Sequence, residues 1–315
     1  MNILVVRTDK LGDFITALPA IYALKHHNRA HHITVCVSAL NEELAHSCDF
    51  IDRVVVDSGG TILQLAKDLK ECKIDISFTL FSNTRVALAQ ALAQIPLRVA
   101  PATKMAQFLY TKRVKQRRSQ VKMAEFEYNL KLIKSYFKDM DLNYPKPILS
   151  FDKQQIKKIY TEFTTSYNIT KKVVAIHPGS GGSNDANLSE KEYVALVSQI
   201  RSLNRFETVM IFGPDEDNLR ARYEELLNGQ NIVFYSSKNG IVEFAKLIAS
   251  FEYFISTSTG TYHLASAVGV KTITFFAPSL FASHRRWKAI GTLSDQVAYT
   301  LPKSINSIVE SNFQN

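Results

Sequence analysis

The 315-residue chain is poor in cysteine, and the three that it has are too few and too irregularly spaced for a disulfide framework or a zinc site. They are Cys36, Cys48 and Cys72, and their scarcity favours a reducing compartment. No stretch reaches the ~20 apolar residues that a membrane-crossing helix needs. The apolar start, Ile3–Val6, meets Arg7 at once and is too short for a signal peptide, so we expect a cytoplasmic protein.

Two common nucleotide-binding motifs are also missing. The chain contains neither a G-x-G-x-x-G fingerprint nor a P-loop ending in G-K-[ST], which removes support for hydride transfer with NAD and for ATP hydrolysis. The histidines that cluster between residues 26 and 32 lack a third type of converging ligand, so they do not predict a metal site. We therefore expect a protein that uses neither a metal nor another cofactor.

Apolar sequence is plentiful, at 46% of residues with 21% charged, and this is enough to bury a globular core. Two domains are expected at this length, because single cores seldom grow past ~250–300 residues. Short β-branched runs alternate with helical patterns, which predicts an α/β fold of parallel sheets. Prolines in segment 144–147 disfavour helix and sheet alike, so we predict domains 1–150 and 151–315.

The predicted elements repeat in the two halves of the chain. In the first half we predict strands at 3–6, 33–37, 54–56 and 76–80, with helices beginning near Asp13, Glu42, Thr61 and Arg85. In the second half we predict a helix at 153–167 and strands at 173–176, 209–212, 232–235, 253–255 and 272–276. The same architecture is therefore expected twice.

Positive charge is in excess, with a formal net charge of +9, which suggests an anionic partner or membrane surface. Much of it lies between residues 104 and 122, a segment without acidic residues that carries Lys104, Lys112, Arg113, Lys115, Arg117, Arg118 and Lys122. This basic segment is either an ordinary solvated face or a surface that binds phosphates or a membrane.

Three turns are candidates for the chemistry, because ligands of open parallel sheets bind beyond the carboxyl ends of the strands. The turn after the first strand leads to Asp13, which is either a helix N-cap or an ionised carboxylate able to accept a proton. The glycine-rich turn 177–183 could cradle a diphosphate with its amides. A hydroxyl-rich turn at 256–261 opens a helix, which is an anion site that needs no metal.

Four segments, taken in order, resemble glycosyltransferase family 9, the ADP-heptose:lipopolysaccharide heptosyltransferases. They are R-T-D-K-L-G-D from Arg7, H-P-G-S-G-G-S from His177, F-G-P-D-E from Phe212 and S-T-G-T-Y-H-L-A-S-A-x-G from Ser258. The resemblance covers nearly the whole chain. It implies the GT-B fold, two Rossmann-like parallel-sheet domains facing across a cleft, with the acceptor on the first and the nucleotide sugar on the second. The last helix could pack back on the first domain.

The resemblance also implies an inverting transfer of heptose from ADP-heptose to the inner core of lipopolysaccharide, with Asp13 as the general base. The residues expected to bind the donor are Ser180, Gly181, Gly182, Ser183, Glu216, Ser258, Thr259, Gly260, Thr261 and His263. Those expected to bind the anionic acceptor are Arg7, Lys10, Lys112, Arg113 and Arg117. The basic segment would add peripheral association with the inner face of the plasma membrane. No nucleic-acid partner is expected.

Two positions depart from the pattern of the family. Ser258 stands where relatives usually have aspartate, and the turn 183–188 lacks the lysine or arginine that follows the glycines in relatives. Residues that could replace the missing charge beside a departing diphosphate are Arg285, Arg286 and Lys288. These departures leave two alternatives, a transferase of another nucleotide-activated sugar and a nucleotide-sugar-binding protein with weak catalysis.

Overall fold

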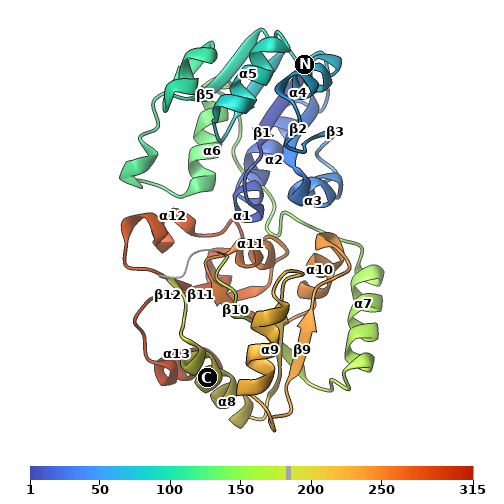
Figure 1. The fold of residues 1–315 in the computed structure, drawn as a ribbon, viewed down its shortest axis with the longest axis vertical. Helices are drawn as coiled ribbons and strands as arrows, with labels where there is room; N and C mark the ends of the chain where they lie inside the picture. The colour runs from blue at the N-terminus through green and yellow to red at the C-terminus, as the bar shows by residue number, and fades with distance from the viewer. Residues whose placement is uncertain (182–185, 315) are drawn as a thin grey trace. The chain divides into compact units, whose positions relative to one another are not determined.

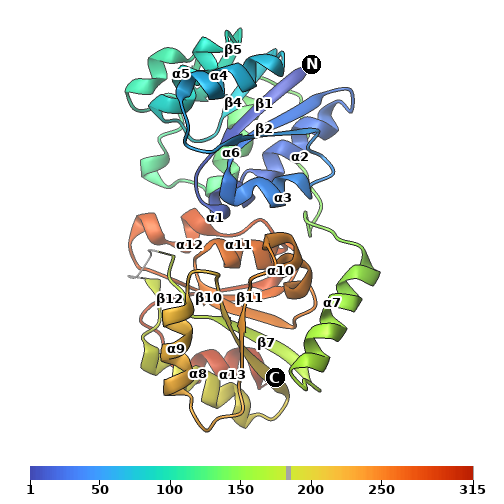
Figure 2. The ribbon, with the colours of Figure 1, turned by 45° about the vertical axis from the view of Figure 1, so that its right-hand side comes forward.

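The computed structural model describes residues 1–181 and 186–314 and divides the chain into two units, Met1–Pro145 and Lys146–Asn315 (Figures 1 and 2). Each unit is built around a six-stranded parallel sheet. The division falls before the predicted boundary at residue 150, because the following segment already pairs with the second unit. The amides of Ile148 and Leu149 both donate to the carbonyl oxygen of Ala267, at 3.1 Å.

The first unit has the strand order β3-β2-β1-β4-β5-β6. Its strands are β1 (Asn2–Arg7), β2 (His32–Ser38), β3 (Arg53–Asp57), β4 (Ile76–Thr79), β5 (Leu97–Pro101) and β6 (Lys112–Val114). Its helices are α1 (Leu11–Ile15), α2 (Leu18–His27), α3 (Glu42–His46), α4 (Ile62–Glu71), α5 (Thr84–Leu92) and α6 (Glu125–Lys134), with the 3₁₀ helices η1 (Ala39–Asn41), η2 (Met105–Leu109) and η3 (Arg118–Gln120). The order reverses between β1 and β4, so the carboxyl ends of these strands mark the expected ligand site.

The central strand β1 is buried on both faces, which explains its uninterrupted apolar run. Leu4 and Val6 pack in a cluster with side chains of α4 and α5, among them Leu65, Leu69 and Val86. The α2 and α6 helices contact each other. The long helices therefore form two pairs, α4 with α5 and α2 with α6, which can be followed in Figures 1 and 2.

The second unit repeats this topology with the order β12-β11-β10-β7-β8-β9. Its strands are β7 (Lys172–His177), β8 (Phe206–Phe212), β9 (Val233–Ser236), β10 (Tyr253–Thr257), β11 (Lys271–Phe276) and β12 (Gln296–Thr300). Its helices are α7 (Lys153–Ser166), α8 (Glu190–Ser202), α9 (Asp217–Leu226), α10 (Ile241–Ile248), α11 (Gly260–Ala267), α12 (His284–Trp287) and α13 (Ile305–Phe313), with the 3₁₀ helices η5 (Leu280–Ala282) and η6 (Leu293–Asp295). Here the order reverses between β7 and β10.

The last helix, α13, belongs to the core of the second unit. Its Ile308 and Phe313 join a buried cluster with Leu196 and Ile200 of α8. The structure therefore places α13 differently from the prediction that it packs back on the first domain. Its apolar face completes the core beside α8, and burial of that face stabilises this position.

The three cysteines are buried and free. Burial raises the pKa of the Cys36 thiol above its usual range, so this thiol is unreactive at neutral pH. Within residues 1–181 and 186–314, none of the helices combines the length and the apolar character that crossing a bilayer requires.

Candidate active site

Asp13 lies in α1, the short helix that follows β1, next to the point where the strand order reverses. Helix α1 begins at Leu11 and its N-cap is Lys10, so Asp13 lies within the helix. The N-cap alternative for Asp13 is therefore wrong. Its Oδ1 atom accepts a hydrogen bond of 2.5 Å from Nη2 of Arg7, and its side chain keeps 18% exposure. This contact fixes the direction of a carboxylate that remains partly accessible to solvent.

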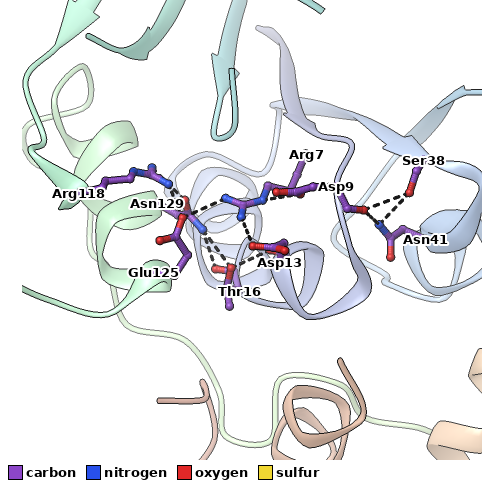
Figure 3. A network of polar contacts seen from close by, with 9 residues as sticks. All are labelled: Arg7, Asp9, Asp13, Thr16, Ser38, Asn41, Arg118, Glu125 and Asn129. Atoms are coloured by element: carbon purple, nitrogen blue, oxygen red, sulfur yellow. Dashed lines mark hydrogen bonds and ion pairs between the residues drawn. The ribbon is translucent and has the colours of Figure 1, made fainter. Parts of the chain in front are cut away.

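Arg7 is 2% exposed and is shared by three carboxylates, as Figure 3 shows. Besides the contact with Asp13, its Nε donates to Asp9 at 2.8 Å and its Nη1 donates to Glu125 at 3.4 Å. Burial alone would lower the pKa of Arg7, but the three carboxylates raise it above its ordinary value. The guanidinium therefore stays charged and holds the turn together.

The pKa of Asp9 in this network is shifted toward neutral pH. Burial and the charge of Asp13 raise the pKa of Asp9 to about 6, although Arg7 acts in the opposite direction. The carbonyl oxygen of Asp9 accepts hydrogen bonds from Ser38 at 3.3 Å and from Asn41 at 3.0 Å. The backbone of the turn is thereby attached to the end of β2 and to η1.

Helix α6 supports the turn from its other side. Glu125 accepts hydrogen bonds from Arg118 and Arg7, and Asn129 accepts one from Arg118 at 3.3 Å (Figure 3). Asn129 also donates to the carbonyl oxygen of Thr16, the C-cap of α1, at 3.1 Å. One residue of the basic segment, Arg118, is thereby connected through α6 to the helix that carries Asp13.

The residues predicted to bind the acceptor lie in different environments. Arg7 is buried in the carboxylate network, and Lys10 is exposed at the start of α1. Lys112 donates to the carbonyl oxygen of Ser135 at 2.8 Å, at the end of α6, where the helix dipole favours a cation. The other two residues are exposed. Arg113 lies on β6, and Arg117 lies just after this strand.

In the second unit a polar relay joins the carboxyl ends of three neighbouring strands, β8, β7 and β10. Oε2 of Glu216 lies 3.0 Å from Nε2 of His177, and Nδ1 of His177 lies 3.2 Å from the hydroxyl of Thr261. That hydroxyl lies 2.9 Å from the hydroxyl of Thr259. Burial alone would raise the pKa of Glu216, but hydrogen bonds from His177 and from the amide of Gly213 lower it below its usual range. Because an ionised carboxylate only accepts, Nε2 of His177 carries the proton.

Helix α11 starts at this relay, with Thr259 as its N-cap. Within the described residues, the side chain of Thr259 makes no capping hydrogen bond. The first amides of a helix have no carbonyl partner within it, and such amides are donors that an anion can accept from. His263 is 3% exposed, and burial lowers its pKa to about 4. It is therefore neutral at pH 7, and it can offer a diphosphate a neutral hydrogen bond but no positive charge.

The predicted donor residues before α11 follow β7 and β10. Ser180 and Gly181 belong to the turn after β7, and a Cβ on Gly181 would lie 3.6 Å from a side-chain atom of Thr259, so the two turns approach each other. Ser258 lies between β10 and the N-cap of α11. Gly182 and Ser183 lie outside the described residues. The structure thus brings the residues predicted to bind the donor, as far as it describes them, together at one end of the second sheet.

The model of glycosyltransferase family 9 (heptosyltransferase) matches residues 62–315. The chain belongs to glycosyltransferase family 9. A Haemophilus influenzae protein described as an inferred glycosyltransferase is 34% identical over 310 residues, which is 96% of this chain and 89% of that one. Lipooligosaccharide heptosyltransferase 2 of Campylobacter jejuni is 25% identical over 298 residues, with coverage of 91% and 85%.

The fold of this family 9 glycosyltransferase agrees with a solved structure. E. coli ADP-heptose LPS heptosyltransferase II matches it with a TM-score of 0.83 at 16% identity, over 98% of this chain and 97% of that chain. This likeness confirms the predicted GT-B fold of two Rossmann-like units. The predicted resemblance to the family and the glycosyltransferase class are confirmed as well.

The basic residues predicted to replace the missing cation lie in or beside α12. The ring of Trp287 in α12 lies 6.2 Å from the ring of His263, and the amide of Ala289 donates to the hydroxyl of Tyr262 at 2.9 Å. These contacts pack α12 and its end against α11. A role in charge compensation remains a prediction for Arg285, Arg286 and Lys288.

Some residues of the two networks were not predicted from the sequence, and they include Glu125, Asn129 and His177. Glu125 lies 118 positions from Arg7, and no local pattern connects the two. His177 belongs to a motif that the sequence already singled out, and its position at the carboxyl end of β7 was the available signal.

The carboxylate of Glu216 occupies the space that a side chain at Gly179 would fill. A Cβ at this position would lie 2.1 Å from Oε1 of Glu216 and 2.8 Å from the ring of His177. We expect Gly179→Ala to displace the carboxylate, break its contact with His177 and weaken ADP binding by about 10- to 100-fold, the range for losing a hydrogen bond to a charged group. Titration calorimetry with ADP measures this change.

A matched control for this substitution is Gly60→Ala, because a Cβ there would meet its nearest neighbour only at 3.8 Å. We expect this control variant to bind ADP as the parent does. Unchanged ADP affinity in Gly179→Ala would contradict a role for the Glu216–His177 pair in nucleotide binding.

Proposed function

We propose that this glycosyltransferase transfers heptose from ADP-heptose to a phosphorylated sugar of the lipopolysaccharide inner core, with inversion at the anomeric carbon. The observation that carries the proposal is the Asp13 carboxylate, held by Arg7 and partly exposed at the carboxyl end of β1. Support for the donor and acceptor comes from the E. coli and Campylobacter jejuni proteins, whose names specify heptosyl transfer.

In this proposal Asp13 is the general base. It takes the proton from the acceptor hydroxyl as that oxygen attacks the anomeric carbon of the heptose. The bond between this carbon and the diphosphate oxygen breaks, and ADP leaves with the electron pair. The first amides of α11 and the hydroxyls of Thr259 and Thr261 stabilise the departing diphosphate, so the reaction needs no metal ion.

Glu216 is proposed to bind the ribose of the nucleotide. The hydrogen bonds from His177 and Gly213 both reach its Oε2 atom, whereas Oε1 is directed over Gly179. The pKa of this carboxylate lies below its usual range, so it is ionised at neutral pH and accepts hydrogen bonds from ribose hydroxyls.

The acceptor is proposed to meet the positive charges of the first unit. Lys10 lies beside Asp13 in the sequence, and Arg113 and Arg117 are exposed in the basic segment. Phosphates on the acceptor would pair with such residues through charge-assisted hydrogen bonds. We place the reaction in the cytoplasm, at the inner face of the plasma membrane.

A screen of nucleotide sugars tests this function. The purified protein is incubated with a heptose-free lipopolysaccharide core and with ADP-heptose, ADP-glucose or UDP-N-acetylglucosamine. The masses of the products are then measured by mass spectrometry. We expect addition of heptose only, and transfer that persists in excess chelator. Titration calorimetry should show tighter binding of ADP than of UDP.

Two outcomes would contradict the proposal in different ways. Transfer of a hexose or an N-acetylhexosamine in preference to heptose would assign another donor. Binding of nucleotide sugars without turnover on any lipopolysaccharide core would indicate a binding protein.

A further inference from the structure

The 3₁₀ helix η2 carries two large apolar side chains in contact with solvent. Met105 is 80% exposed and Phe108 is 66% exposed. Residues three apart in a 3₁₀ helix lie one above the other, so these two side chains share one face. The opposite face is packed, because Ala106 and Tyr110 form a buried cluster with Ala87 of α5. The packed face therefore fixes the position of η2, and the exposed pair does not belong to the core.

Positive charge surrounds this apolar pair. Lys104 precedes η2 and is exposed, and the guanidinium of Arg113 lies 5.6 Å from the centre of the Phe108 ring. Lys115 and Arg117 are exposed just beyond, and the whole basic segment contains no acidic residue. Lysine is depleted in protein–protein interfaces, whereas apolar side chains bordered by lysine and arginine suit the boundary of an anionic bilayer.

This surface begins beside the turn that holds Asp13. The ring of Phe81, after β4, lies 5.8 Å from the guanidinium of Arg7 and 4.6 Å from the ammonium of Lys104. Lys104 also donates to the carbonyl oxygen of Ser82 at 3.4 Å. A membrane bound at η2 would therefore lie close to the candidate base.

We propose that Met105 and Phe108 insert into the interfacial layer of an anionic phospholipid bilayer while the surrounding lysines and arginines contact the headgroups. The apolar pair supplies the insertion and the charges supply the selectivity for anionic lipid. This docking rests on the proposed function, which places the reaction at the inner face of the plasma membrane, and it names the side chains that bind the bilayer there. It requires neither a sugar donor nor an acceptor, so it can be measured without transfer.

Vesicle binding tests the proposal with the purified full chain. We expect the protein to sediment with vesicles of phosphatidylglycerol and phosphatidylethanolamine and to bind them more weakly as the salt concentration is raised. We expect it not to sediment with vesicles of phosphatidylcholine. The double variant Met105→Ser with Phe108→Ser should bind about tenfold or more weakly, because its apolar insertion is lost. Lys104→Gln and Lys115→Gln should each weaken binding about fivefold.

Leu63→Ser is the matched control, because Leu63 is 70% exposed in the same unit but lies in α4, outside the basic segment. We expect it to bind vesicles as the parent does. Equal vesicle binding by the double serine variant and the parent would overturn the proposal. A dimer of the parent that is lost in the double serine variant would also overturn it, because the face would then join two copies of the chain.

An activity measurement separates docking from catalysis. The double serine variant is expected to retain the rate of the parent on a delipidated, soluble acceptor and to lose rate only on acceptor embedded in anionic vesicles. Loss of rate on both acceptors would show that these side chains act in the reaction and not in docking. If the parent transferred no sugar, the proposed function would be contradicted, whereas vesicle binding would still test the docking proposal.

Discussion

Replacing Asp13 by asparagine is expected to lower kcat by about 10²–10⁴-fold, the usual contribution of a general base. Asparagine has nearly the same shape, and its amide oxygen can still accept the hydrogen bond from Arg7, so the turn should keep its structure. ADP-heptose binding should change little, because the residues proposed to hold the donor belong to the second unit. The rate of ADP release and the calorimetric dissociation constant measure the two effects separately.

Asp9→Asn is the matched control for this experiment, because Asp9 also accepts a hydrogen bond from Arg7 and lies in the same turn. Its pKa of about 6 makes it the rival candidate for a base that works near neutral pH. We expect Asp9→Asn to keep kcat within about tenfold of the parent. If Asp9 were the base, its variant would lose turnover, the parent rate would fall below about pH 6, and Asp13→Asn would stay active.

The central strands could be predicted from the sequence because strands buried on both faces are continuous apolar runs. Residues 33–37 were predicted as a strand and form most of β2, and residues 253–255 lie within β10. Helix starts were also predicted closely where a capping residue marks them. Thr61 is the N-cap of α4, and its hydroxyl accepts the amide of Gln64 at 3.2 Å.

The strands that were not predicted lie toward the edges of the sheets. The β5 strand includes Arg98 and ends at Pro101, and β6 has only three residues, of which Lys112 and Arg113 are basic. Short strands with charge and proline are typical of sheet edges, where one side of the ladder stays unpaired. Their pairing depends on the neighbouring strand, and hydrophobic periodicity within such a segment does not reveal it.

The candidate site was predictable only in part, for a related reason. Asp13 follows a strand that periodicity identifies, so its place at the carboxyl end of the sheet could be derived. Arg7 orients Asp13, and residues of α6 hold Arg7 and the end of α1 in turn. Only tertiary packing brings Glu125 and Asn129 to these partners. The contact of His177 with Glu216 likewise depends on the pairing of β7 with β8.

Replacing Arg7 by methionine is expected to lower the free energy of unfolding by about 3–5 kcal/mol, the usual cost of removing one partner from a buried ion pair. The substitution leaves Asp9, Asp13 and Glu125 without the cation that they share, and Glu125, at 5% side-chain exposure, has little access to water. Urea titration followed by circular dichroism measures the loss. The single tryptophan, Trp287, lies in the second unit, so fluorescence should report a smaller change than circular dichroism.

Lys25→Met provides the control, because Lys25 pairs with Asp52 in the same unit with side-chain exposures of 20% and 27%. We expect its loss of stability to stay within about 1 kcal/mol, as is usual for exposed pairs. Lowering the pH from 8 to 5 should reduce the difference in the free energy of unfolding between the parent and Arg7→Met. In the parent, burial raises the folded-state pKa of Asp9 to about 6 from its ordinary 3.8, although Arg7 acts to lower it. Without Arg7 this pKa rises further, so protonation of Asp9 as the pH falls stabilises the folded variant more than the folded parent. If this difference in the free energy of unfolding were the same at both pH values, Arg7 would act through packing and not through the carboxylates around it.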